Sequence, residues 1–230
     1  MSTHFRPRSS LLSALLLLTS ACGGGMEGQA APTLSADSRT PLRSEEDRLG
    51  IGGTVEVFDY GSVMDFIVMG GGMQLMDARV TFDGMPVEYD MARGSYNLVE
   101  FYGSVFHSGR SVEVCATWEE ESLCRTLTAP GAATILLPVS ESSVSGSQPY
   151  WGYWKAAEGA SRYDIRVLAS DSSVLNSVSM SGGVSYLFSP VDYTGLATFS
   201  LAAVAIMPDS DVLGTLEVKR VSQVSFSFVP

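Results

Sequence analysis

Apolar and polar residues alternate in short runs along much of the chain after residue 50. A period of two is typical of strands that bury one face, and Gly, Asp and Pro separate the runs. The dipeptide Asp83-Gly84 favours a tight hairpin turn between two of them. The pattern in this part of the chain predicts strands at Thr54–Asp59, Val63–Met69, Ala78–Phe82, Val87–Asp90, Tyr96–Phe101, Val112–Thr117 and Ser122–Thr128.

The alternating pattern continues in the C-terminal half after an interruption at Ala129-Pro-Gly-Ala-Ala, which we interpret as a domain boundary. The second half predicts strands at Tyr150–Lys155, Tyr163–Val167, Val174–Val178, Val184–Phe188, Ala197–Ile206 and Leu216–Phe228. The expected fold class is therefore all-β, with two tandem β-sandwich domains. The spacing of the strands in residues 51–130 is typical of an immunoglobulin-like sandwich.

The second domain, residues 131–230, carries a resemblance to a known family. Trp154 stands near a strand end and is followed by Glu158-Gly-Ala and then by Tyr163 in an alternating strand. This arrangement resembles the region around the second and third strands of fibronectin type III domains. The resemblance implies that Trp154 and Tyr163 are core residues of facing sheets. Phe199 departs from the family, because a tyrosine that ties down the chain with its hydroxyl is usual there.

The aromatic run Tyr150-Trp-Gly-Tyr-Trp154 is the strongest candidate for a binding site. Neighbouring residues of a strand point to opposite faces, so a buried Trp154 places Trp151 and Tyr153 outward. Two outward aromatic side chains would form a platform for a sugar ring or a protein partner. The alternative is structural, since aromatic side chains also pack across strands, against Val167 or a neighbouring domain.

The N-terminus has the features of an export signal. Arg6 and Arg8 precede an apolar run at residues 11–18, and the small residues Thr19-Ser-Ala lead to Cys22. The run is too short to span a bilayer. Leu18-Thr-Ser-Ala-Cys22 resembles the lipobox of bacterial lipoproteins, although Thr19 stands where Leu is more usual. The resemblance implies that residues 1–21 are a signal peptide and that Cys22 is lipidated. The alternative is a secreted protein cleaved near Ala21.

Residues 22–50 are expected to form a flexible tether, because Gly, Ser, Pro and charged residues dominate them. Gly23 is not the Asp that retains many lipoproteins at an inner membrane, which by resemblance favours the outer membrane. Residues 1–21 hold two of the 14 basic residues and none of the 25 acidic ones, so the mature chain has a net charge of 12 − 25 = −13. Such an acidic chain is a poor partner for nucleic acid.

Lipidation of Cys22 would leave Cys115 and Cys124 as a pair in an oxidising compartment, where we expect a disulfide. If their strands pair about the Glu119–Glu121 loop, facing residue numbers sum to 239, and 115 and 124 satisfy that sum. Alternation then places the bridge on the more exposed face of the hairpin.

Catalytic and metal-binding chemistry finds little support in the sequence. His107 could act with Ser104 or Ser108, but His107-Ser-Gly-Arg is a turn sequence. The carboxylates of Asp209-Ser-Asp211 and Glu119–Glu121 lack the spacing of a dedicated calcium loop, and solvated loop tips are the usual role of such runs. We therefore predict no enzyme activity, no cofactor and no dedicated metal site; calcium binding by the acidic loops is the alternative that the sequence leaves open.

These observations together predict a lipid-anchored protein of the cell envelope with a structural or adhesive, protein-binding role. The alternative is a carbohydrate-binding accessory module that uses Trp151 and Tyr153. A hydrolase built around His107 is a third class with weaker support. Neither the partner nor the side of the membrane that the protein faces follows from the sequence.

Overall fold

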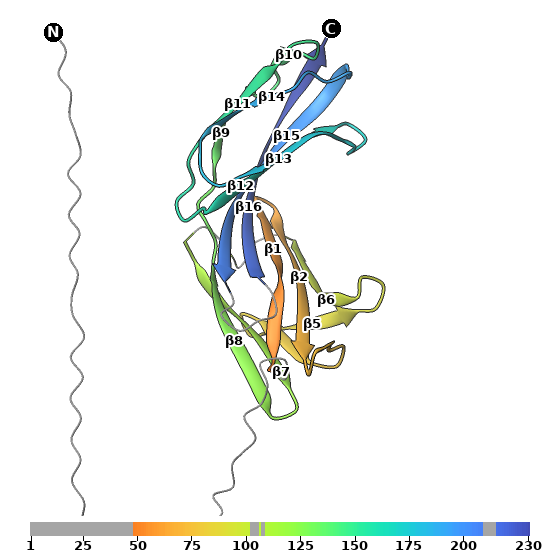
Figure 1. Ribbon diagram of the computed structural model, residues 1–230, viewed down its shortest axis with the longest axis vertical. Coiled ribbons are helices and arrows are strands. Elements are labelled where there is room, and N and C mark those ends of the chain that lie inside the picture. The colour runs from red at the N-terminus through yellow and green to blue at the C-terminus, as the bar shows by residue number, and fades with distance from the viewer. Residues whose placement is uncertain (1–47, 102–105, 107–108, 209–214) are drawn as a thin grey trace, which may run out of the picture. The chain divides into compact units, whose positions relative to one another are not determined.

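The computed structural model describes residues 48–101, 106, 109–208 and 215–230, which belong to one compact unit. Its regular elements are all strands, and the fold class is all-β and sandwich-like (Figure 1). None of the described residues forms a helix long and apolar enough to cross a membrane. The strands are β1 (Gly50–Phe58), β2 (Gly61–Gly70), β3 (Met73–Gln74), β4 (Arg79–Phe82), β5 (Met85–Asp90), β6 (Ser95–Phe101), β7 (Ser111–Trp118), β8 (Glu121–Thr128), β9 (Thr134–Leu137), β10 (Ser143–Ser145), β11 (Tyr150–Lys155), β12 (Arg162–Ala169), β13 (Val174–Met180), β14 (Ser185–Phe188), β15 (Gly195–Pro208) and β16 (Thr215–Val229).

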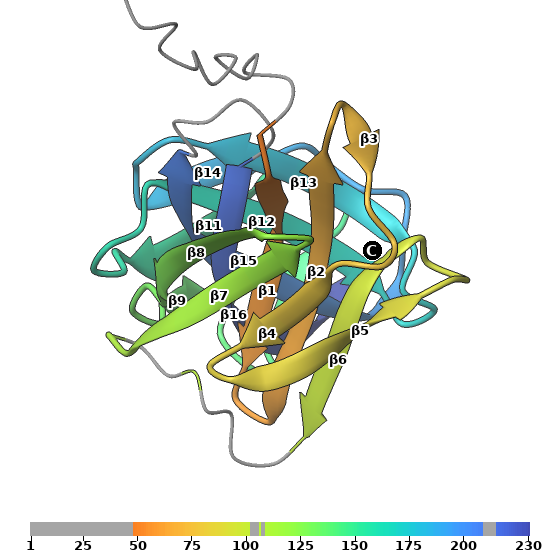
Figure 2. The same cartoon turned by 90° about the horizontal axis from the view of Figure 1, so that it is seen from below.

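The first lobe consists of β1 to β8 together with the N-terminal part of β16. One layer holds β16, β1, β2 and β6, and the other holds β4, β7 and β8 (Figure 2). Strand β5 joins the layers, because Met85–Val87 pairs with β4 and Glu88–Asp90 pairs with β6. The first core lies between the layers and includes Phe66, Phe82 and Val114. All seven strands predicted for this region are present.

Two local predictions in the first lobe are confirmed. Asp83 and Gly84 have φ angles of 50° and 80° and connect paired residues Phe82 and Met85, as a two-residue hairpin requires. Cys115 lies opposite Cys124 in the β7–β8 pair, and the two form a disulfide. The bridge lies on the partly exposed face of β7, while Val112, Val114 and Ala116 on the other face are buried.

The second lobe packs two sheets around a second core. One sheet holds β13, β12, β15 and β16, with β10 on the far side of β16, and the other holds β14, β11 and β9. Large aromatic side chains fill the space between them, among them Trp154, Phe188, Phe199, Phe226 and Phe228. Strands β9 and β10 are additions to the six strands that the alternation predicts.

The β15–β16 hairpin contributes to both lobes. Residues 215–228 of β16 pair with β15, and residues 216–220 pair in addition with residues 53–57 of β1, in parallel (Figure 1). Leu216 and Val218 are buried in the first core, and Phe226 and Phe228 in the second. The first core ends at Ala129 and the second begins at Ala133, but the first core also takes side chains from the last strand of the chain.

We predict that Leu216→Ala destabilises the first lobe by about 2–5 kcal/mol, because Leu216 is 2% exposed and a cavity would remain in the first core. Leu196→Ala is a matched control, since Leu196 is 56% exposed on β15. Denaturant unfolding followed through the fluorescence of Trp118, which packs against the first core, measures the difference. Equal effects of the two substitutions would contradict the shared core.

Candidate functional site

Strand β11 places its aromatic side chains alternately in the core and on the surface. Tyr150 and Trp154 are buried, at 6% and 2% exposed, whereas Trp151 and Tyr153 are 47% and 36% exposed. Gly152 lies on the buried face between them. The predicted register of this strand is therefore confirmed, and so is the predicted burial of Trp154.

Close packing beneath Gly152 fixes this register. A Cβ atom at Gly152 would lie 2.9 Å from Cζ of Phe199 and 3.0 Å from Cε2 of Phe188, closer than side chains tolerate. Only a residue without a side chain lets β11 approach these rings. A shift of the strand by one residue would press an aromatic side chain into the same space.

Hydrogen bonds hold the buried aromatic residues on either side of this contact. The hydroxyl of Tyr150 accepts a hydrogen bond from Nδ2 of Asn176 at 3.1 Å. Burial raises the pKa of Tyr150 to about 12, and the bond from Asn176 opposes the rise without cancelling it. The hydroxyl of Tyr163 accepts a bond from the backbone N–H of Ala157 at 2.8 Å, and its ring lies 5.5 Å from that of Trp154. The core roles that the resemblance implied for Trp154 and Tyr163 are confirmed.

Phe199 is fully buried in β15, and the hydroxyl that ties down the corner before this strand comes from another residue. Tyr193 donates a hydrogen bond to the carbonyl of Leu196 at 2.9 Å and accepts one from the N–H of Ser170 at 3.3 Å. The chain therefore keeps a tyrosine anchor next to β15, six residues before the position where the family pattern places it. Nothing in the sequence pattern marks Tyr193 for this role.

The outward side chains of the three-stranded sheet form one apolar surface, which we call the platform: Trp151, Tyr153, Leu137 and Leu187. The rings of Trp151 and Tyr153 lie 5.4 Å apart with an angle of 31° between their planes. Leu187 of β14 lies opposite Trp151, and Leu137 of β9 lies opposite Tyr153. All four side chains are exposed, and no described segment covers them.

Sequence reasoning finds the aromatic half of the platform and misses the aliphatic half. Leu137 belongs to β9, a strand of four residues whose sequence Thr-Ile-Leu-Leu shows no alternation. The feature of the sequence that could have predicted this strand is the apolar run itself, which has the length of a short strand. Leu187 lies in the predicted strand at Val184–Phe188, but its position beside Trp151 depends on a pairing between strands far apart in the sequence.

Several other candidates lie outside the described residues, namely Cys22, the residues of the tether up to 47, Ser104, His107, Ser108, Asp209 and Asp211. Glu119 and Glu120 form the turn between β7 and β8, and Glu121 is the first residue of β8. Within the described ranges, one group of potential metal ligands comes together, Glu113 with Cys115 and Cys124. Both sulfur atoms of that group are bonded to each other, so it is a poor metal site.

Comparison with known proteins yields no family model and no curated protein that matches this chain. Among solved structures, the chain is similar to the fibronectin(III)-like modules of Clostridium thermocellum CbhA at 14% sequence identity and a TM-score of 0.26. The match covers 75% of this chain and 94% of that one.

We predict that Trp154→Ala destabilises the second lobe by about 3–5 kcal/mol, because it removes a large buried side chain. Trp151→Ala is the matched control three residues away, and it should change the free energy of unfolding by no more than about 0.5 kcal/mol. Thermal and denaturant unfolding of both variants measure this difference. A larger loss for Trp151→Ala would show that the register of β11 is shifted by one residue.

Proposed function

We propose that this chain is a lipid-anchored, non-catalytic protein of the cell envelope that binds a protein partner through the platform. The exposed apolar surface made by Trp151, Tyr153, Leu137 and Leu187 carries the proposal. Exposed apolar groups that gather on one surface mark interaction sites more often than scattered ones do. Trp and Tyr are also the residues that most often dominate binding energy at protein interfaces.

The composition of the platform favours a protein over a glycan. Its rings lie side by side and have aliphatic neighbours, and Leu137 and Leu187 have no group that could bond to a sugar hydroxyl. A partner side chain can bury itself against such a surface and gain from the removal of apolar area from water. A carbohydrate-binding accessory module is the alternative, and the binding experiment below distinguishes it.

The envelope location rests on the lipobox-like sequence at Leu18–Cys22 and on the charged, Gly-rich segment that follows it. The Cys115–Cys124 disulfide is consistent with an oxidising compartment, since such bonds are rare where thiols are kept reduced. Two or three acyl chains on Cys22 would hold the protein at a membrane stably, whereas a single chain would not. Gly23 favours the outer membrane.

We predict that a fatty-acid analogue labels the protein metabolically and that Cys22→Ser abolishes both the label and the membrane association. The substitution removes the thiol that the acyl group would modify, and it leaves the apolar run at residues 11–18 intact. Fractionation and gel fluorescence measure the two effects. A correctly cleaved wild-type protein without label would contradict the proposed anchor.

We predict that a photo-crosslinking amino acid in place of Leu187 captures an envelope protein in intact cells, and that Trp151→Ala reduces the yield several-fold. Leu187 lies opposite Trp151, so the probe reports on what touches the platform. Met91→Ala, which removes an 80% exposed side chain in the first lobe, is the control and should leave the yield unchanged. Capture of polysaccharide instead of protein would favour the carbohydrate-binding alternative.

A further inference from the structure

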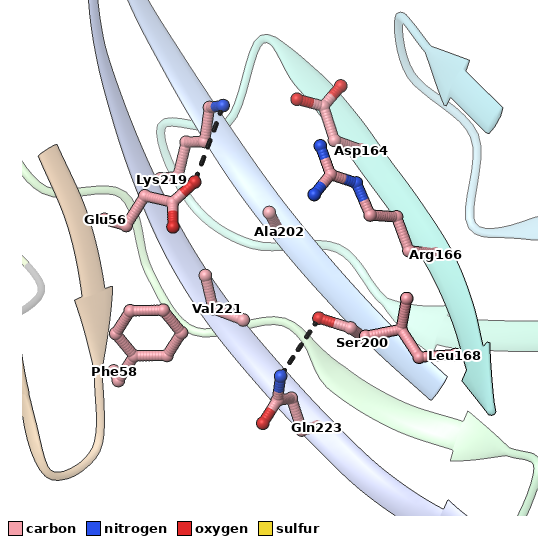
Figure 3. Close-up of a pocket in the computed structure, with 10 residues that line it drawn as sticks. All are labelled: Glu56, Phe58, Asp164, Arg166, Leu168, Ser200, Ala202, Lys219, Val221 and Gln223. Carbon is pink, nitrogen blue, oxygen red and sulfur yellow. Dashed lines mark hydrogen bonds and ion pairs between the residues drawn. The ribbon is translucent and has the colours of Figure 1, made fainter. Parts of the chain in front are cut away.

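A groove lies on the outer face of the sheet formed by β12, β15, β16 and β1, where the two lobes meet (Figure 3). It encloses about 160 Å³, and the small side chain of Ala202 and that of Val221 line its floor. Both are only 8% exposed although they face away from the two cores. Longer side chains on the same and neighbouring strands surround them, and the groove is the space above these two shorter side chains.

The carboxylates around the groove already have cationic partners. Arg162 contacts Asp164 through two bonds of 2.9 and 3.1 Å and Glu217 through one of 3.0 Å. Lys219 lies 3.7 Å from Glu56 and 3.8 Å from Glu217.

The ionisation of this network follows from the same contacts. Burial acts to raise the pKa of Asp164, but hydrogen bonds from Arg162 and Ser179, together with nearby positive charge, hold that pKa below its usual value. The bonds with Asp164 and then Glu217 raise the pKa of Arg162. The carboxylate of Asp164 therefore stays charged and bonded at neutral pH.

Arg166 is different, because it makes no ion pair with any described residue. Its neighbours across the sheet are Ser200 and Ser177, whose short side chains leave its guanidinium uncovered. Figure 3 shows Arg166 and Lys219 on opposite sides of Ala202. Only 12 basic residues follow residue 21 in this acidic chain, and Arg166 is the one that lines the groove without an ion pair to a described residue. A guanidinium can bind a carboxylate through two parallel hydrogen bonds.

The rest of the groove offers neutral hydrogen-bonding groups and an aromatic surface. Nε2 of Gln223 donates to Oγ of Ser200 at 3.3 Å, which leaves the hydroxyl hydrogen of Ser200 and the carbonyl oxygen of Gln223 for a ligand. A second hollow of about 180 Å³ shares Phe58, Val221 and Gln223 with the groove and extends it to Tyr60. Tyr60 is 59% exposed and stacks on Phe58 at 5.2 Å. Asp59, also in this hollow, is paired with Arg220 at 2.6 Å.

We propose that this groove is a second binding site and that it takes an acidic oligosaccharide, in which sugar rings carry a carboxylate. Arg166 binds the carboxylate, Ser200 and Gln223 bind ring hydroxyls, and Tyr60 offers its outer face for stacking on a neighbouring ring. An extended peptide fits less well, because β15 and β16 have paired strands on both sides and leave no sheet edge for a further strand.

The groove and the platform lie on opposite faces of the second lobe, because the second core separates their two sheets. Binding at one surface therefore leaves the other accessible. A protein with both sites can hold an envelope protein against an acidic polysaccharide, which goes beyond the single partner of the proposed function.

Calorimetric titration of the full chain with trigalacturonate tests the site, with the methyl-esterified trisaccharide as a matched neutral probe. We expect the acid to bind and the ester to bind about tenfold or more weakly, because the ester lacks the charge that Arg166 recognises. Arg166→Gln should weaken binding of the acid by a similar factor, and Tyr60→Ala should weaken both probes. Arg93→Gln, at an exposed arginine beside Asp90, should have no effect.

Three results would overturn the proposal: no binding of the acid, equal binding of acid and ester, or unchanged binding in Arg166→Gln. Thermal unfolding checks that Arg166→Gln remains folded, as expected for an exposed residue. Trp151→Ala separates the two surfaces. It should leave trigalacturonate binding intact, and a loss there would place the sugar on the platform instead of in the groove. Failure to capture a protein at the platform would not affect this titration.

Discussion

The pairing of β16 with β1 is the constraint on which the arrangement of the two lobes depends. Five residue pairs from Gly53↔Leu216 to Val57↔Arg220 join the first strand of the described fold to the last. Without them, β1 would be an edge strand and the first core would lose Leu216 and Val218. The first lobe therefore cannot complete its core until the end of the chain has folded. Pairing between segments so far apart in sequence carries a large loop-closure cost, which the burial of two cores offsets.

The same pairing creates the surface at which the groove forms. Side chains on one face of β16 enter the cores. Those on the other face line the groove side of the sheet: Glu217, Lys219, Val221 and Gln223. Strand β15 lies along one edge of β16, and β1 lies along the other edge at residues 216–220. Arg220 faces the core side and bonds to the carbonyl of Phe58 and to Asp59, which secures the end of β1. Phe58 is thereby held next to Val221. The ion pairs that Arg162 and Lys219 make with Glu217 and Glu56 link β12, β16 and β1 beside the groove.

Much of the local structure could be predicted from the sequence, because it depends on periods of two and on turn residues. Alternation predicted the positions of the long strands, Asp83-Gly84 predicted its hairpin, and the register of the β7–β8 pair brought Cys115 opposite Cys124. The outward direction of Trp151 and Tyr153 followed from one buried tryptophan. Each of these inferences needs only residues within about one hairpin of one another.

The parts that escaped prediction are those that depend on distant pairings. The alternation of β16 does not show that its two halves pack into different cores. Its even-numbered residues face inward along the whole strand, Leu216 and Val218 into the first core and Phe226 and Phe228 into the second. Leu187 and Leu137 join Trp151 and Tyr153 only through the order of strands in the smaller sheet, and Arg166 stands apart only because its neighbours on both sides are serines. The sequence shows which residues are charged, but whether a charged side chain already has a bonding partner within the protein depends on which residues the fold places beside it. In this protein that difference separates Arg162, which is committed to two carboxylates, from Arg166 four residues later.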